Sequence, residues 1–428
     1  MFLRSFKLFV AALTAALLSV ACGNGEPAPA PTGVTVSAGE SSATVAWNMT
    51  DGVEYWVFFG PSSVAPTTTS TMQGWFGLPL GNVILKASSP YTVTGLLNGT
   101  DYSFSINART NGGPGGPGSA AVVTAPRIAG ASWQAASAVS AAPELRSVSF
   151  GTTTATTTTV AVNSYVAAGA GGAIYSSPDG AAWSAVNYAS SANINAGAYF
   201  GTFKLVGDGG LVLLSSDAAT WTPQTSGTTE NLYAIASNSI NLNVAVGANG
   251  TIISSVDGVT WTPASSSGTT QDLYAVTYSA YNNGLWLAVG AGGTMVQSTD
   301  GLTWTSVASN TQANLRAITY GAIVSTSTTG VITATSAFVA VGASGTLLSS
   351  ADGANWSAQT LPGAGSLNAV VYGTQFVTVG AGGKIFISAD GINWTPTTSA
   401  TSQNLYAVAR GSLAYSAVGA AGTNLLSK

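Results

Sequence analysis

A short motif, Ser-x-Asp-Gly-x-x-Trp, constrains the fold of this chain more than any other feature, because it recurs throughout residues 177–394. The Asp residues of successive copies are 38 to 52 residues apart, as from Asp179 to Asp217 and from Asp300 to Asp352. A repeat of this length is typical of small supersecondary units that bury their apolar faces against one another in a stack or a ring. The six copies are SPDGAAW (177–183), SSDAATW (215–221), SVDGVTW (255–261), STDGLTW (298–304), SADGANW (350–356) and SADGINW (388–394).

Each repeat also contains a Gly-x-x-Gly turn between two apolar runs, as in NVAVGANGTIISS (243–255). Short runs rich in Val, Ile, Thr and Tyr between Gly-rich turns predict β-strands, and each repeat has room for four of them. The turns begin at Gly169, Gly207, Gly247, Gly290, Gly342, Gly380 and Gly419. Seven turns predict seven four-stranded units, so we expect an all-β propeller over residues 129–428.

The last turn, at Gly419, is not followed by an Asp-Gly motif, but residues 129–137 supply a matching segment. AGASWQAAS (129–137) aligns with DGANWSAQT (352–360), with Gly130 and Trp133 in the motif positions and Ala129 in place of Asp. We therefore predict that residues 131–137 form the outer strand of the seventh unit. Pairing of the N- and C-terminal strands would close the ring and leave no open sheet edge.

These repeats resemble the Asp-box, or bacterial neuraminidase repeat, of β-propellers, and the likeness covers residues 129–428. The repeats are also similar to those of the photosystem II stability and assembly factor family, which implies a seven-bladed propeller without a catalytic role. The fibronectin-like segment and lipoprotein-like signal described below are not part of that family's pattern. Sialidases share the Asp-box, and this resemblance implies glycoside hydrolysis as the competing function.

The repeated Asp-box residues are expected to be structural. Asp and Ser side chains accept hydrogen bonds from nearby backbone N–H groups and fix tight turns, and Trp can cover such a turn. Catalysis would not need six equivalent copies. The residues concerned are Asp179, Asp217, Asp257, Asp300, Asp352 and Asp390, with Trp183, Trp221, Trp261, Trp304, Trp356 and Trp394.

Differences between the repeats are more informative about function. The residue after the Leu or Ile that opens each predicted inner strand is polar or aromatic, and inner strands line the channel of a propeller. These seven positions, Arg146, Asn195, Tyr233, Tyr274, Arg316, Asn368 and Tyr406, should form a ring near one channel mouth. Arg pairs with carboxylates and Tyr provides rigid contact area, so the ring is a candidate site for a carboxylate, a sugar or a protein loop. The alternative is that these side chains only fill and hydrate the entrance. The residues before each opening Leu or Ile, such as Glu144 and Asn193, are expected to form turns.

Residues 31–127 have a different pattern, with strands of alternating apolar residues in PTGVTVSAGESSATVAWNMTDGVEYWVFFG (31–60). Trp47 and the segment LLNGTDYSFSINA (96–108) resemble a fibronectin type III domain. That likeness implies a β-sandwich with Trp47 in its core and with Tyr102 as the corner tyrosine, whose hydroxyl bonds back to the backbone.

The N-terminus has the features of an export signal. Arg4 and Lys7 precede an apolar run that ends in SVAC, which predicts a signal peptide over residues 1–21. LLSVAC resembles a bacterial lipoprotein signal, although Ser19 stands where that family usually has Leu. The resemblance implies lipidation of Cys22, a tether over residues 22–30 and an outer-membrane location, periplasmic or surface-exposed. Ordinary cleavage and secretion is the alternative.

Composition excludes several function classes. Charged residues are 6% of the chain, the net charge is −4 and no basic run occurs, which argues against nucleic acid as a partner. With no His and one Cys, we expect no metal site, and no cofactor is predicted.

Two functions therefore compete. A sialidase-like glycoside hydrolase would need paired carboxylates, but Asp208 and Asp272 lie outside the boxes without an evident partner, and Arg127-Ile128 is followed by Ala129 where sialidases have Pro. We instead expect a non-catalytic, envelope-anchored binding or scaffolding protein that recognises an envelope or extracellular protein or glycan.

Overall fold

The computed structural model describes residues 27–63, 82–137, 139, 141, 143–154, 161–238, 242–280, 284–326, 332–412 and 414–427. The predicted signal peptide, Cys22 and the start of the tether lie outside this range. The chain divides into two compact units, Met1–Ile128 and Ala129–Lys428. Among the described residues, no helix has the length and apolar character needed to cross a membrane.

The first unit contains two antiparallel sheets, with strand orders β1-β2-β5 and β4-β3-β6-β7. The strands are β1 (Thr35–Gly39), β2 (Ser42–Ala46), β3 (Val53–Pro61), β4 (Asn82–Ala87), β5 (Tyr91–Thr94), β6 (Tyr102–Thr110) and β7 (Val122–Thr124). Buried residues from both sheets, including Val45 and Phe104, form one core around Trp47. The hydroxyl of Tyr102 accepts a hydrogen bond from the backbone N–H of Leu97 at 3.2 Å, as a corner tyrosine does.

The second unit contains seven four-stranded antiparallel sheets within its described residues, each with a 3₁₀ turn between its second and third strands. The first strands are β9 (Leu145–Thr154), β13 (Ile194–Phe200), β17 (Leu232–Ser237), β21 (Leu273–Ser279), β25 (Leu315–Thr326), β29 (Leu367–Tyr372) and β33 (Leu405–Arg410). The second strands are β10 (Ala161–Gly169), β14 (Thr202–Gly207), β18 (Asn243–Gly247), β22 (Leu285–Gly290), β26 (Ile332–Gly342), β30 (Phe376–Gly380) and β34 (Tyr415–Gly419).

The remaining elements complete each sheet in the same order. The turns are η1 (Ala170–Gly172), η2 (Asp208–Gly210), η3 (Ala248–Gly250), η4 (Ala291–Gly293), η5 (Ala343–Gly345), η6 (Ala381–Gly383) and η7 (Ala420–Gly422). The third strands are β11 (Ile174–Ser177), β15 (Val212–Ser215), β19 (Ile252–Ser255), β23 (Met295–Ser298), β27 (Thr346–Ser350), β31 (Ile385–Ser388) and β35 (Asn424–Ser427). The outer strands are β12 (Ser184–Val186), β16 (Thr222–Gln224), β20 (Thr262–Pro263), β24 (Thr305–Ser306), β28 (Ser357–Thr360), β32 (Thr395–Pro396) and β8 (Trp133–Ala135).

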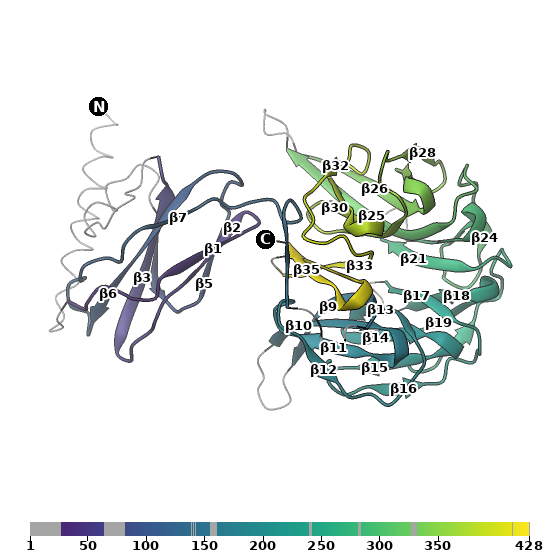
Figure 1. Ribbon diagram of the computed structural model, residues 1–428, viewed down its shortest axis with the longest axis horizontal. Helices are drawn as coiled ribbons and strands as arrows, with labels where there is room; N and C mark the ends of the chain where they lie inside the picture. Colours follow the sequence, from purple (N-terminus) through teal and green to yellow (C-terminus); the bar gives the residue numbers. More distant parts are fainter. Residues whose placement is uncertain are drawn as a thin grey trace. The chain divides into compact units, whose positions relative to one another are not determined.

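The sheets are arranged around a common centre (Figure 1). Each first strand contacts the first strands of the sheets before and after it, and β33 contacts β9, so the inner strands form a closed ring. The predicted all-β propeller is therefore confirmed. The mouth at which the inner strands begin carries the 3₁₀ turns, and the opposite end carries the Asp-Gly turns between third and outer strands.

Closure of the ring by the two ends of the propeller is confirmed as well. β8 pairs with β35, with Ala135 opposite Leu425 and Trp133 opposite Ser427. Gly130 adopts a φ of +90°, and the indole of Trp133 donates to its carbonyl at 2.9 Å. The same indole bond occurs in four of the complete Asp-Gly turns, so the segment is a turn of this type that lacks its Asp.

The Ser/Thr-rich stretches of the first and fifth sheets extend the β-structure as far as they are described. β9 pairs with β10 out to Thr154 and Ala161, and β25 pairs with β26 out to Thr326 and Ile332. These two hairpins are the longest in the propeller and project at the end that carries the Asp-Gly turns.

Candidate binding ring at the channel mouth

The last glycine of each second strand determines how closely two strands approach each other at the channel mouth. At Gly290, for example, an added Cβ would lie 1.8 Å from the carbonyl oxygen of Asp272, so a side chain has no room there. The backbone of the second strand thus approaches the start of the inner strand very closely. The same contact recurs at Gly169, Gly207, Gly247, Gly342, Gly380 and Gly419.

The close approach coincides with a β-bulge in every inner strand. In β17, Leu232 pairs with Gly247 and Ala234 pairs with Val246, which leaves Tyr233 as the extra residue. Bulges redirect a side chain and are frequent beside functional sites. The extra residue is in every sheet the predicted ring residue, namely Arg146, Asn195, Tyr233, Tyr274, Arg316, Asn368 or Tyr406. The residue pattern predicted the ring positions, but it gave no sign of the bulges that produce them.

Arg146 and Asn195 form a hydrogen-bonded chain across the first three sheets. The Arg146 guanidinium donates to Oε1 of Glu144 at 2.8 Å and to Oδ1 of Asn195 at 3.0 Å. The amide of Asn195 donates in turn to Oδ1 of Asp208 at 2.8 Å and to the carbonyl of Leu232 at 3.0 Å. This Arg is therefore neutralised by the acid that directly precedes its strand.

Arg316 and Asn368 form the same chain across the fifth to seventh sheets. Arg316 donates to Oδ1 of Asn368 at 2.6 Å, and Asn368 donates to the carbonyl of Leu405 at 2.8 Å. The Arg316 side chain is exposed. Within the described part of the chain, no carboxylate lies within 4 Å of its guanidinium.

Three tyrosines complete the ring. The rings of Tyr233 and Tyr274 lie with their centroids 5.7 Å apart and tilted by 52°. Burial raises the pKa of Tyr274, Asp272 and Tyr233 raise it further and the nearby Arg316 lowers it by less, so its hydroxyl stays protonated at neutral pH. Tyr406 is half-buried on β33, beside the strand that carries Asn368.

Five of the seven residues that precede an opening Leu or Ile make a hydrogen bond to a neighbouring sheet. Asn231 accepts a hydrogen bond from the N–H of Gly209, in the 3₁₀ turn of the preceding sheet, at 2.9 Å. Asn193, Asp272, Asn314 and Asn404 make the equivalent bond. These side chains cap the 3₁₀ turn of the preceding sheet and so link adjacent sheets at the mouth, a role that the sequence pattern did not indicate.

The two acids that lacked evident partners in the sequence both have them in the structure. Asp208 accepts from the amides of Asn193 and Asn195, each at 2.8 Å. Asp272 accepts from the N–H of Asn249 at 2.9 Å. Asp208 thus ties the start of its own sheet's inner strand to the 3₁₀ turn, whereas Asp272 links its sheet to the preceding one; the sequence could not reveal either contact because the partners lie 13 to 23 residues away.

At the opposite end, the six Asp-Gly turns share one set of hydrogen bonds. In the third turn the hydroxyl of Ser255 donates to Asp257 at 2.9 Å and accepts from the N–H of Gly258 at 2.8 Å. The N–H groups of Thr260 and Val259 donate to Asp257 and lower its pKa to about 2. The pKa of each of the other five Asp residues is lowered too. These carboxylates therefore stay ionised as hydrogen-bond acceptors within their own turns.

One turn has Ala in place of the Gly, and two turns, those of Trp221 and Trp394, lack the indole bond. Ala218 replaces the Gly and adopts a φ of +62°, a conformation that disfavours residues with a Cβ. The indole N–H of Trp221 is buried without a hydrogen-bond partner. The turn keeps its Ser and Asp bonds, including that from Ser215 to Asp217 at 3.0 Å, so the loss is confined to the Gly and Trp positions.

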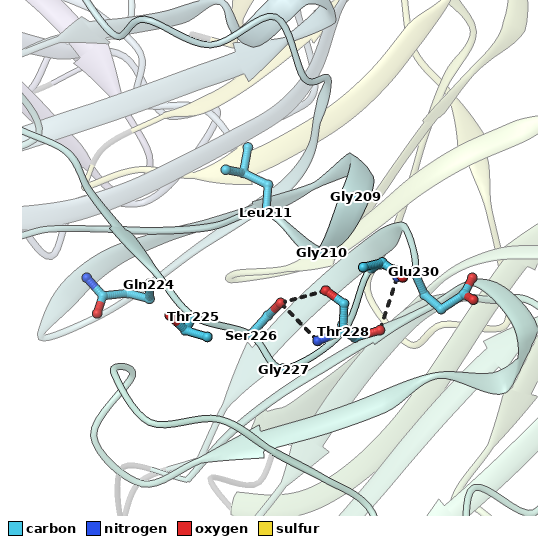
Figure 2. A pocket seen from close by; sticks show the side chains of 10 residues that line it. Gly209, Gly210, Leu211, Gln224, Thr225, Ser226, Gly227, Thr228 and Glu230 are labelled. Atoms are coloured by element: carbon cyan, nitrogen blue, oxygen red, sulfur yellow. Dashed lines mark hydrogen bonds between the residues drawn. The ribbon is translucent and has the colours of Figure 1, made fainter.

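A shallow pocket of about 670 Å³ lies where the chain leaves the second sheet toward the third, and no residue of the ring lines it (Figure 2). It is lined by η2 and by residues 224–230, and Figure 2 shows the Ser226 hydroxyl bonded to Thr228 along this segment. Ser, Thr and Gly dominate the lining and no aromatic side chain contributes, so the pocket lacks the apolar surface of a typical small-molecule site. The described residues contain no cluster of three metal-binding side chains.

Comparisons with known proteins agree with this architecture. The fibronectin type III domain model matches residues 29–125. A structure described as "YCF48 bound to D1 peptide" has a TM-score of 0.52 and 16% identity, over 69% of this chain and 94% of that chain. YCF48 from Cyanidioschyzon merolae has the same score and identity, over 69% of this chain and 99% of that chain. A streptogramin B lyase has a TM-score of 0.52 and 10% identity, over 69% of this chain and 97% of that chain. No curated protein matches the sequence. At these identities the likeness is one of fold: the chain combines a fibronectin type III domain with a β-propeller.

Proposed function

We propose that this chain is a non-catalytic binding and scaffolding protein that presents the channel mouth of its propeller to a protein or glycan partner. The observation that carries the proposal is the ring of seven bulges. Every sheet has the same backbone at this point, yet the bulged side chain is Arg, Asn or Tyr according to the sheet. A fold requirement would select one residue type at seven equivalent positions, whereas recognition of an asymmetric partner requires several.

The opposite end supports the same division of roles. Its turns repeat one arrangement, in which Ser and Asp bond to the backbone of their own turn. We assign these turns to the Asp-box class and give them a structural role. A hydrolase of the sialidase type would need a pair of carboxylates that remain available to substrate. Glu144 and Asp208 at the mouth are instead engaged by Arg146 and Asn195, which favours binding over hydrolysis.

We further propose that the protein is exported and anchored to the outer membrane by a lipid on Cys22, with the fibronectin type III domain as a spacer. This rests on the signal-like N-terminus and on the position of the chain's single Cys directly after it. Labelling with a palmitate analogue tests the anchor: wild type should incorporate the label and Cys22→Ser should not. Absence of label from both would favour ordinary secretion.

Affinity purification of the full-length protein from its native envelope tests the binding role. Arg146→Ala and Arg316→Ala should each reduce partner recovery, while Val256→Ala, on an exposed Asp-Gly turn at the other end, should not. Equal recovery by all variants would rule out the ring. Turnover of a chromogenic glycoside, abolished by changing Asp208, Asp272 or Glu230, would replace the binding role with the hydrolase.

A further inference from the structure

The first three sheets of the propeller match its last three. We call these two groups of sheets the Arg146 unit and the Arg316 unit. Arg146, Asn195 and Tyr233 in the first correspond to Arg316, Asn368 and Tyr406 in the second. Both units have the same relay from Arg to Asn to a Leu carbonyl of the next inner strand. This likeness concerns hydrogen bonds as well as residue types.

The match extends to the long hairpins. The hydroxyl of Tyr199 donates to the carbonyl of Thr152, and that of Tyr372 donates to the carbonyl of Ala322. The two rings cover Gly151 and Gly321, where a Cβ would overlap the Tyr in each case. The two units therefore share one construction, from hairpin to channel mouth.

The two units differ in their acidic residues, which are present at two positions of the first and absent from the same positions of the second. Glu144, which pairs with Arg146, corresponds to Asn314, since both directly precede the opening Leu of their strand. Asp208, which pairs with Asn195, corresponds to Ala381, since both directly follow the last Gly of a second strand. Asn314 uses its oxygen to cap the N–H of Gly292 at 2.8 Å, so it does not replace Glu144 at the Arg.

The nearest acid on the preceding strand does not replace it either. Asp272 is engaged by the N–H of Asn249 and lies beyond ion-pair distance of Arg316. A guanidinium has five N–H donors, and Asn368 accepts from one of its nitrogens. Arg316 is exposed at the mouth and close enough to Tyr274 to lower that group's pKa, but it has no carboxylate partner among the described residues, whereas its counterpart Arg146 already holds one.

We propose that the Arg316 unit binds a carboxylate of a peptide ligand, and that Glu144 occupies the corresponding place in the Arg146 unit as a built-in substitute. The propeller then has one open carboxylate site and one closed one. A carboxylate only accepts hydrogen bonds, whereas the hydroxyls of a sugar must also donate. The open unit offers Arg316 as donor but has lost both acidic acceptors, which favours a peptide carboxylate over an acidic sugar. This inference rests on the proposed binding function and assigns its ligand chemistry.

Titration followed by NMR of the Arg Nε–H groups in the full-length protein tests the proposal. The probes are N-acetylglycine for a terminal carboxylate, N-acetylaspartate α-amide for a side-chain carboxylate, N-acetylglycinamide as the uncharged control and glucuronate for an acidic sugar. The Arg316 signal, assigned by its loss in Arg316→Lys, should shift saturably with at least one acidic peptide probe. The Arg146 signal should not. Dissociation constants of about 1 mM are adequate for such fragments.

Exchanging the differing residues provides the matched variants. Asn314→Glu should close the open site and weaken the Arg316 response at least about tenfold, which corresponds to 1.4 kcal/mol. Glu144→Asn should open the closed site, so that Arg146 begins to respond. Asn231→Glu also removes a turn cap and adds an acid, but its strand carries Tyr233 instead of Arg, so the Arg316 response should persist.

An Arg316 signal unaffected by all acidic probes would overturn the proposal, as would equal shifts with N-acetylglycinamide or a stronger response to glucuronate. These results are independent of the envelope purification. If Arg316→Ala lost its partner while no carboxylate moved the Arg316 signal, the binding role would stand and the carboxylate assignment would fall.

Discussion

The two ends of the propeller use the same sheets in opposite ways. At the Asp-Gly turns the side chains are nearly the same in six of the seven sheets and bond to their own backbone, as Ser255 and Asp257 do. At the channel mouth the backbone is the repeated part, and the bulged side chains differ from sheet to sheet and bond across sheets, as Arg146 and Asn195 do. The comparison indicates that side chains repeated from sheet to sheet maintain the fold, whereas side chains that differ between sheets form the candidate site.

The largest effect is expected from opening the ring. Trp133 is 5% exposed and begins the outer strand that pairs with β35. Trp133→Ala should lower the free energy of unfolding by about 3 to 5 kcal/mol, and deletion of residues 131–137 should abolish the cooperative transition of the propeller. Thermal denaturation followed by near-UV circular dichroism measures both. Gln134→Ala, exposed on the same strand, is the control and should change stability by less than about 0.5 kcal/mol. A deletion variant with the wild-type Tm would disprove closure by this strand.

A glycine at the mouth should be the next most sensitive position. Gly290→Ala would place a Cβ against the carbonyl of Asp272 and disrupt the bulge at Tyr274, for an expected cost of about 3 kcal/mol or more. Gly292→Ala lies two residues away at a φ of +59° with open space around it, and should cost about 1 kcal/mol. Urea denaturation of both variants compares them. Equal costs would show that the close backbone approach does not shape the mouth.

Lys204 is a buried, ionisable residue at a core position that is apolar in most of the other sheets. It is 4% exposed and donates to the carbonyl of Phe200 and to the hydroxyl of Thr202, and burial lowers its pKa. Five other sheets have a buried Val or Leu at this position, as at Val244. Lys204→Met should therefore raise the free energy of unfolding by about 1 to 3 kcal/mol at pH 7. Val244→Met is the size control and should not stabilise.

The pH dependence of stability gives the same substitution a second test. The unfolded chain retains the Lys proton up to the ordinary pKa of 10.5, and the folded chain releases it earlier. Wild-type stability should therefore gain a contribution as pH rises from the lowered pKa to 10.5, since the unfolded state binds more protons there. Lys204→Met should lack this gain. A gain of the same size in both proteins would show that the amine is not responsible.

The smallest effect concerns the one turn of the six that has Ala in the Gly position. Ala218→Gly removes a Cβ from a residue with φ of +62° and should stabilise by about 0.5 to 1 kcal/mol. Gly258→Ala, at the equivalent position with φ of +73°, should destabilise by at least a similar amount. Differential scanning calorimetry resolves both changes. If Ala218→Gly does not stabilise the protein and Gly258→Ala does not destabilise it, the turn tolerates a Cβ at this position.

Much of the fold could be predicted from the sequence because its signals are local. Each Asp-Gly turn bonds within three residues, so its pattern can be read directly, and Gly130 with Trp133 identified the closing segment for the same reason. The ring positions followed from their place after each opening Leu or Ile. The Arg–Asn relays could not be predicted because they depend on contacts between sheets, and the bulges and the partner of Asp208 could not because they depend on a close backbone approach and on contacts distant in sequence.

The central claim is that partners bind the varied mouth and not the constant end. A photo-crosslinking residue placed at Tyr406, in the ring, or at Val256, 72% exposed on an Asp-Gly turn, tests it most directly in the native envelope. We expect covalent adducts with a partner from position 406 and none from position 256. Adducts from position 256 together with none from position 406 would contradict the assignment of the mouth as the binding surface.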